Sequence, residues 1–251
     1  IIAECYHLMR DVLQLTQDEM SQVFDRWNKG FLNSFLIEIT SDILKYRNEK
    51  GEYLLEKIRD AAQQKGTGKW TTVAALDFGI PVTLISSAVF ERCLSALKDE
   101  RVVASQELRG APTAPFSGDK GKFIDMLSQA IYASKLVSYA QGFMLFREAA
   151  KQYKWDLNYG GIALMWRGGC IIRSVFLGDI KKAFENNPNL SNLLLDGFFK
   201  KAIGDCYAGW REVVSTAVNN DIPLPAITTA LYFYNGFRSE KLPANLIQAM
   251  R

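Results

Sequence analysis

The sequence predicts an all-α protein, and three observations support this fold class. Apolar residues recur every three or four positions through most of the chain, which is the period of helices that pack through one face. Alternating apolar and polar stretches, which are typical of strands, are scarce. Residues typical of helix starts precede several of the apolar runs. The 251 residues, 48% of them hydrophobic, are enough to bury a large core.

The first predicted helix starts at a capping motif. Thr16 and Glu19 have the spacing of a capping box, in which the hydroxyl and the carboxylate each satisfy a free backbone N–H. The apolar residues that follow at helical spacing are Met20, Val23, Phe24 and Trp27. Another stripe at steps of four consists of Phe31, Phe35, Ile39 and Ile43.

Prolines and apolar spacing predict further helices. Pro81 fits the first turn of a helix that runs to about Leu97, since a helix does not need the N–H that proline lacks there. A long helical stretch ends near Tyr153, and Pro243 opens a last helix over 244–251. The five tryptophans, Trp27, Trp70, Trp155, Trp166 and Trp210, are expected to anchor the core or an interface.

Two halves of the chain resemble one another. Residues 79–88 match residues 221–230 without a gap at an offset of 142, and residues 27–30 match 166–169 at an offset of 139. A stretch rich in Gly, Pro and Ser lies between the halves, over 105–121. A shared order at a nearly constant offset predicts two tandem pseudo-repeats, about 1–105 and 120–251, within one helical domain.

Composition excludes several classes of function. The chain has 30 basic and 27 acidic residues and a net charge of +3, which argues against nucleic acid and membrane surfaces as partners. A single histidine and four widely separated cysteines predict no metal site and reduced thiols in a cytosolic protein. No signal peptide or membrane-spanning run is recognisable. The start at Ile1 without Met suggests a fragment of a longer protein.

A glycine-containing turn carries the most informative chemistry. Residues 64–70 read Gln-Lys-Gly-Thr-Gly-Lys-Trp, and Arg92 follows on a predicted helix. Glycines let backbone N–H groups approach a ligand, and lysine and arginine supply positive charge, so the pattern favours a phosphorylated small molecule. Exposed charges that only face solvent are the alternative for Lys65 and Arg92.

Only the first half carries this basic cluster. At the offset of 142, Tyr207 corresponds to Lys65 and Tyr234 to Arg92. A site that diverges between similar halves favours a ligand role, although solvated surface charges also diverge. Lys69 does not belong to a nucleotide P-loop, because the motif's first glycine is Gln63 here and the lysine precedes Trp70 instead of Ser or Thr.

Longer words of the sequence resemble the 6-phosphogluconate dehydrogenase family. The resemblance runs from Tyr6 to Arg251 and is carried by ungapped words, with residues 106–120 the least informative part. These words are residues 65–71 (KGTGKWT), 81–85 (PVTLI), 97–101 (LKDER), 140–143 (AQGF), 165–174 (MWRGGCIIRS) and 242–249 (LPANLIQA).

The resemblance implies a fold, an activity and partners. This chain is expected to be the helical C-terminal domain, which follows an NADP-binding domain in a homodimeric cytoplasmic enzyme. The implied reaction is the oxidative decarboxylation of 6-phosphogluconate to ribulose 5-phosphate, CO₂ and NADPH. It belongs to the pentose phosphate pathway and to gluconate utilisation.

The resemblance also implies site residues. Lys65, Thr67 and Arg92 match the residues that bind the substrate phosphate, and Arg251 matches an arginine that reaches across from the partner subunit. The family's catalytic Lys and Glu fall before Ile1, its partner histidine falls beyond Arg251, and the dinucleotide fingerprint is missing. We therefore expect this chain to contain no catalytic residue, no cofactor-binding residue and no metal ligand. The fragment alone is expected not to turn over substrate.

Two other functions compete with this interpretation. A different sugar-acid or β-hydroxyacid dehydrogenase has a substrate without phosphate and does not need Lys65, Thr67, Arg92 and Arg251 together. A non-enzymatic helical interaction module, built from the same repeat, predicts no selective binding of phosphate.

Overall fold

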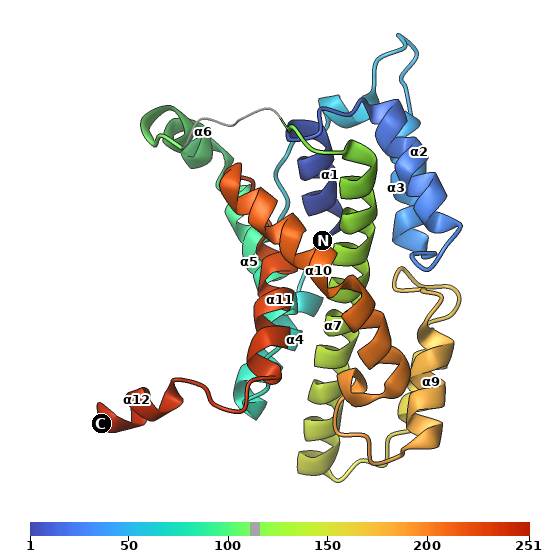
Figure 1. The fold of residues 1–251 in the computed structure, drawn as a ribbon, viewed down its shortest axis with the longest axis vertical. Coiled ribbons are helices and arrows are strands. Elements are labelled where there is room, and N and C mark those ends of the chain that lie inside the picture. The colour runs from blue at the N-terminus through green and yellow to red at the C-terminus, as the bar shows by residue number, and fades with distance from the viewer. Residues whose placement is uncertain (111–115) are drawn as a thin grey trace.

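The described residues form an all-α structure, as predicted. The computed structural model describes residues 1–110 and 116–251 (Figure 1), and these contain helices and no strand. The α-helices are α1 (Ile2–Asp11), α2 (Gln17–Asn28), α3 (Phe35–Lys45), α4 (Thr67–Phe78), α5 (Thr83–Ala96), α6 (Lys98–Glu107), α7 (Lys120–Tyr153), α8 (Tyr159–Met165), α9 (Leu177–Asn186), α10 (Gly197–Asn219), α11 (Pro225–Phe237) and α12 (Ala244–Ala249). Two short 3₁₀ helices are η1 (Leu54–Lys57) and η2 (Leu193–Leu195).

Helix α7 is the central element of the fold. Its 34 residues run through the body of the molecule, and α1, α4, α5, α10 and α11 all pack against it (Figure 1). Its buried residues include Leu127 and Ile131, which join Trp210 of α10 in one hydrophobic core. The predicted long helix ending near Tyr153 is therefore confirmed, and it supports both halves of the chain.

The capping box at α2 is confirmed, but the stripe of Phe31, Phe35, Ile39 and Ile43 is not the buried face of the next helix. The Thr16 hydroxyl accepts a hydrogen bond from the Glu19 N–H, and the Glu19 carboxylate accepts one from the Thr16 N–H. Phe31 precedes α3 and is exposed, as is Ile43. The buried face of α3 is Ile37, Ser41 and Leu44 instead. Ser41 on this face contacts α2, and its hydroxyl lies 3.2 Å from the buried hydroxyl of Ser21.

Helix α5 begins two residues later than Pro81 predicts. Gly79 ends α4 in the left-handed region at φ 68°, a conformation that glycine adopts easily. The chain then turns through Pro81, with the Val82 N–H bonded to the Ile80 carbonyl at 2.9 Å, and α5 starts at Thr83. In the second half, α11 starts at Pro225, which is 142 positions after Thr83 and occupies the first helical turn.

Helices α5 and α11 pack against each other, and each is capped from elsewhere in the chain. The Glu4 carboxylate on α1 accepts hydrogen bonds from Ala226 and Ile227 at the start of α11, at 2.8 and 2.9 Å. The Gln141 side chain on α7 accepts one from the Leu84 N–H of α5 at 3.1 Å. These contacts agree with a tandem duplication, which stays a prediction.

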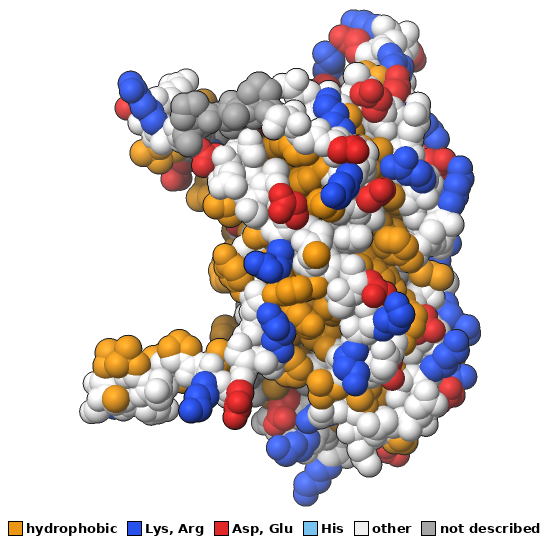
Figure 2. Space-filling model, in the orientation of Figure 1, with side chains coloured by type: hydrophobic (Ala, Val, Ile, Leu, Met, Phe, Trp, Pro, Cys, Tyr) orange, Lys and Arg blue, Asp and Glu red, His pale blue; other side chains and the backbone are white. Residues whose placement is uncertain are grey.

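Helix α12 lies apart from the body. It starts directly after Pro243, as predicted, and ends at Ala249, so Arg251 lies beyond the helix. Figure 1 shows α12 at the end of a connection that projects from α11, and Figure 2 shows hydrophobic side chains along this arm. Leu246, Ile247 and Met250 are exposed. Across the described ranges, no helix has the length and apolar character needed to cross a membrane.

Candidate phosphate site at the start of helix α4

A glycine with an unusual backbone forms the turn before α4. Gly66 is the residue that caps the helix, and its φ of 112° is one that residues with a Cβ rarely adopt. Its N–H donates to the Gln64 side-chain oxygen at 2.8 Å, and its carbonyl accepts from the Trp70 N–H at 2.8 Å. The sequence word Gln-Lys-Gly-Thr-Gly-Lys-Trp therefore folds into a closed turn that opens directly into a helix.

The first turn of α4 offers unpaired N–H groups. Among the described residues, the backbone N–H groups of Thr67, Gly68 and Lys69 form no hydrogen bond. Such groups, together with the helix dipole, favour an anion at this end of a helix. Gly68 also brings α4 close to α5, because a Cβ at this position would lie 2.6 Å from the Val89 Cγ2 atom.

Three of the four predicted site residues adjoin this turn. Lys65 precedes Gly66, and Thr67 is the first residue of α4; both are exposed. Arg92 on α5 reaches the same turn, because its Nε and Nη2 atoms donate to the Gln63 carbonyl at 3.0 and 2.5 Å. Within the described ranges, the Lys65 ammonium has no carboxylate within salt-bridge distance. The arrangement presents positive charge and free donors on one exposed surface.

Arg251 does not join the other three residues within this chain. It follows α12, the helix that projects away from the body in Figure 1, and it is exposed. Arg251 is therefore not part of the arrangement at the start of α4 within this chain.

A second layer of contacts supports the turn, and sequence analysis missed it. The Asp60 carboxylate lies 2.8 Å from Lys98 Nζ and 3.3 Å from Arg101 Nη2. The hydrogen bond from Lys98 lowers the pKa of the Asp60 carboxyl to about 2. Ser95 on α5 contacts the backbone of Ala62. These partners are more than thirty positions apart, so no local sequence pattern announces them.

The second half has no equivalent turn. Tyr207, the counterpart of Lys65, lies inside α10, which continues without a break through the corresponding positions. Its hydroxyl donates to the Asn235 side chain at 2.9 Å and accepts from Arg238 at 2.8 Å. The ring of Tyr234, the counterpart of Arg92, packs on Tyr207 at a centroid distance of 5.7 Å. The polar side chains at this surface bond to one another, and the surface lacks the free N–H groups of a helix start.

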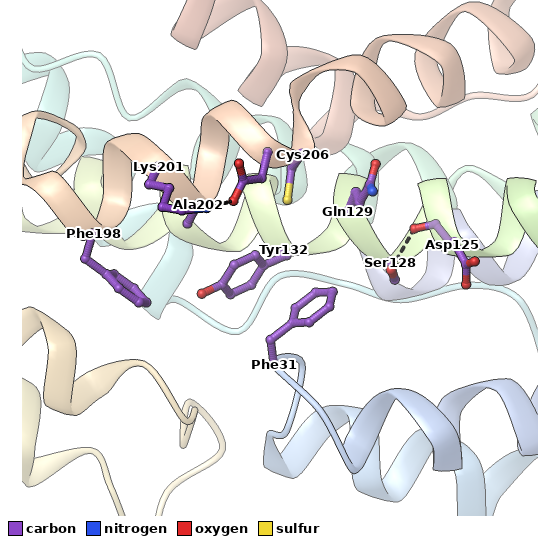
Figure 3. Close-up of a pocket in the computed structure, with 10 residues that line it drawn as sticks. Phe31, Asp125, Ser128, Gln129, Tyr132, Phe198, Lys201, Ala202 and Cys206 are labelled. Atoms are coloured by element: carbon purple, nitrogen blue, oxygen red, sulfur yellow. Dashed lines mark hydrogen bonds and ion pairs between the residues drawn. The ribbon is translucent and has the colours of Figure 1, made fainter.

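A mainly apolar cavity lies away from the turn before α4. A cavity of about 590 Å³ lies between α7 and α10 and faces Phe31 (Figure 3). Tyr132 and Phe198 line it, and its one lysine, Lys201, pairs with Asp205 at 2.5 Å. An aromatic lining and a neutralised lysine do not suit a phosphate dianion. The turn before α4 is therefore the better candidate for a phosphorylated ligand.

The described residues hold no recognisable metal or dinucleotide site. No group of three or more His, Cys, Asp or Glu side chains is arranged to bind a metal ion in the described part of the chain. A dinucleotide-binding unit needs a strand that leads through a glycine-rich turn into a helix, and the described ranges contain no strand. The residues present therefore do not fit NADP as a ligand of this domain alone.

Fold and site together define a class of protein: an all-α domain in which a glycine turn opens a helix whose first N–H groups lie beside a lysine and an arginine. The model of the family "6-phosphogluconate dehydrogenase, C-terminal domain" matches residues 1–251. The chain is 62% identical over 251 residues to the decarboxylating 6-phosphogluconate dehydrogenases of Homo sapiens and Drosophila melanogaster, covering all of this chain and 52% of each relative. The chain belongs to the 6-phosphogluconate dehydrogenase C-terminal domain family.

A solved structure agrees with this assignment. Plasmodium falciparum 6-phosphogluconate dehydrogenase, determined in its apo form, with its cofactor NADP⁺ and with its substrate 6-phosphogluconate, superimposes with a TM-score of 0.95. It is 38% identical and covers 100% of this chain, which spans 54% of that protein. The chain thus spans about half the length of the relatives it matches.

Proposed function

We propose that this chain is the substrate-binding part of an NADP-dependent, decarboxylating 6-phosphogluconate dehydrogenase. The full-length enzyme oxidises 6-phosphogluconate and releases CO₂, ribulose 5-phosphate and NADPH. Lys65, Thr67 and Arg92 bind the phosphate of the substrate, and the catalytic groups lie outside this chain.

The turn at α4 is the observation that carries this proposal. A phosphate dianion needs several charge-assisted donors, and here free helix N–H groups lie beside a lysine and an arginine. The Arg92 guanidinium has five N–H donors. Among the described residues, the Gln63 carbonyl accepts from one donor on Nε and one on Nη2, and Nη1 forms no hydrogen bond. The Nη1 atom therefore remains available to a phosphate oxygen.

Arg251 completes the site from a second copy, in a homodimer. The projecting α12 arm supports this part of the proposal, since its exposed Leu246, Ile247 and Met250 have the apolar character of a surface that packs against a partner. Figure 2 shows further hydrophobic side chains along the hollowed side of the body next to this arm.

NADP is the cofactor of the full-length enzyme, held by a domain that is not part of this chain. The solved relative with bound NADP⁺ supports this assignment, because this chain spans 54% of it. We place the enzyme in the cytoplasm, in the pentose phosphate pathway, on the strength of its relatives' metabolic activity.

The decisive experiment uses the full-length protein. NADPH formation with 6-phosphogluconate and NADP is measured for the parent, for Lys65→Ala and for Arg92→Ala. Each substitution is expected to raise the KM for 6-phosphogluconate by at least tenfold, since hydrogen bonds to charged groups contribute about 1.5–3 kcal/mol each. The KM for NADP stays unchanged. Lys151→Ala, at an exposed lysine of α7, is the matched control.

The two competing functions give different results. A dehydrogenase for a non-phosphorylated sugar acid would oxidise gluconate as readily as 6-phosphogluconate and would tolerate both alanine variants. An interaction module would form no NADPH with either compound. If the alanine variants kept the parental KM, the phosphate would bind elsewhere.

A further inference from the structure

The segment before α4 has to be held in place by something other than secondary structure. Residues 61–65 form no helix or strand, and Ala62, Gln63 and Lys65 are exposed. An unsupported chain of this kind moves freely, whereas a phosphate site needs its donors at fixed positions. The contacts that hold residues 60–64 therefore determine how well Lys65 and Arg92 are placed.

Ser95 makes the central contact of this kind. Its Oγ atom accepts a hydrogen bond from the Ala62 N–H at 2.9 Å. The same hydroxyl lies 2.9 Å from the Ala62 carbonyl and 2.8 Å from the Arg92 carbonyl, to either of which it can donate. The Ser95 side chain therefore binds the Ala62 N–H and, through its single O–H donor, either the Ala62 carbonyl or the Arg92 carbonyl.

Arg101 also connects the segment before α4 to the end of α5. Its Nη2 atom lies 3.0 Å from the Asp60 carbonyl and 3.1 Å from the Ser95 carbonyl. The Arg101 Nε atom is buried and has no hydrogen-bond partner among the described residues. The guanidinium is therefore held between the segment and the end of α5, where it faces Ser95 instead of the phosphate.

We propose that Ser95 is a positioning residue of the phosphate site. By fixing the Ala62 peptide, it fixes the Gln63 carbonyl that follows, and this carbonyl orients the Arg92 guanidinium through two N–H donors. Lys65 is two residues further along the same segment. Ser95 acts through Arg92 and Lys65 and does not touch the ligand. The inference rests on the proposed function, since it concerns the same site.

The test is Ser95→Ala in the full-length enzyme. The KM for 6-phosphogluconate is expected to rise about three- to tenfold, as the loss of one or two hydrogen bonds predicts. The kcat at saturating substrate and the KM for NADP stay within twofold of the parent, because the chemistry and the cofactor site are untouched. Ser95→Thr, which keeps the hydroxyl, restores the parental KM. Ser105→Ala is the matched control, because in the described part of the chain its hydroxyl bonds only to the Val102 carbonyl within α6.

Three results would overturn the inference. The first is an unchanged KM for 6-phosphogluconate in Ser95→Ala. The second is a Ser95→Ala variant in which kcat falls, both KM values rise by the same factor and the melting temperature is lower. The third is a failure of Ser95→Thr to restore substrate binding. Lys65→Ala is measured in parallel, so the two proposals fail separately. If Lys65→Ala raises the KM for 6-phosphogluconate and Ser95→Ala does not, the phosphate site is supported and the positioning role of Ser95 is wrong. If neither raises it, the phosphate site itself is wrong.

Discussion

The hydroxyl of Thr229 lies 3.5 Å from the hydroxyl of Ser87, and the two residues are separated by the same 142 positions that relate the matching words of the sequence. Ser87 lies on α5 and Thr229 on α11, so corresponding positions of the two halves meet where these helices pack. An approximate twofold relationship between two similar units produces such self-contacts. The start of each of the two helices is also capped by a distant side chain: Glu4 for α11 and Gln141 for α5.

Glu4→Ala is expected to destabilise the fold by about 1–3 kcal/mol, because two backbone N–H groups at the start of α11 lose a charged acceptor. Chemical denaturation of the full-length protein measures this change. Glu4→Gln keeps a single acceptor oxygen and should fall between the parent and the alanine variant. Glu49→Ala, at an exposed loop position, is the control that should leave stability unchanged. A Glu4→Ala variant as stable as the parent would show that the cap contributes nothing.

Lys135→Met is expected to stabilise the protein at neutral pH by roughly 1–3 kcal/mol. Burial lowers the pKa of the Lys135 ammonium to about 8, and its Nζ atom is bonded to the Ser174 hydroxyl at 3.2 Å. The unfolded chain keeps this proton up to the ordinary lysine pKa of about 10.4. Between these two pH values the unfolded state binds more protons, so the parent becomes more stable as the pH rises.

Unfolding curves of the parent and Lys135→Met at a series of pH values test this expectation. The advantage of the methionine variant is largest below pH 8 and fades toward pH 10, about the ordinary lysine pKa. Lys151→Met, at an exposed position of α7, should show no such trend. A constant difference across the series would mean that Lys135 keeps its ordinary pKa in the folded state.

Gly66→Ala is expected to weaken substrate binding more than it weakens the fold. A side chain at φ 112° costs about 1–3 kcal/mol of strain, and the turn relaxes by moving Lys65 and Thr67. The KM for 6-phosphogluconate should rise at least fivefold, with a small loss in melting temperature. Gly178→Ala is the control, because it lies in α9 with open space around its Cβ position. Equal KM values for both variants would contradict a role for the turn.

Mixed dimers test whether Arg251 acts in the partner's site. At a 6-phosphogluconate concentration far below the raised KM, Lys65→Ala and Arg251→Ala are each expected to leave every site of their own homodimers largely inactive. A hybrid dimer regains one intact site, built from Lys65 of the Arg251→Ala subunit and Arg251 of the other. Random reassortment of equal amounts should therefore restore about one quarter of the sites. NADPH formation before and after subunit exchange measures this, and the absence of any recovery would place Arg251 in its own subunit's site or in none.

Local patterns predicted the parts of the structure that depend on local physics. The Thr16–Glu19 cap, the long helix to Tyr153 and the start of α12 after Pro243 follow from short-range hydrogen bonds and side-chain spacing. The buried face of α3 did not follow, because it depends on how α3 packs against α2. That packing buries Ile37 and Leu44 and leaves Phe31 and Ile43 exposed. Trp70 and Trp155 are exposed in this chain, so neither lies in its core, and the interface alternative for them stays a prediction. Size and hydrophobicity alone do not say which face of a helix meets its neighbour.

The candidate site divides in the same way. Lys65, Thr67 and Arg92 were recognisable from the sequence, and the structure brings Arg92 to the turn. Asp60, Ser95 and Arg101 were not, since their contacts join the segment before α4 to the corner between α5 and α6. Serine hydroxyls bonded to a distant backbone leave no spacing signal in a single sequence.

The uninterrupted course of α10 limits how this architecture can evolve. A lysine in place of Tyr207 would restore charge, but it would still sit in mid-helix, where backbone donors are consumed by the preceding turn. A second phosphate-binding turn in this half would require a break in α10 near Tyr207. Such a break would expose Trp210, one of the largest fully buried side chains of the core. Single surface substitutions in the second half are therefore not expected to produce a turn like the one before α4.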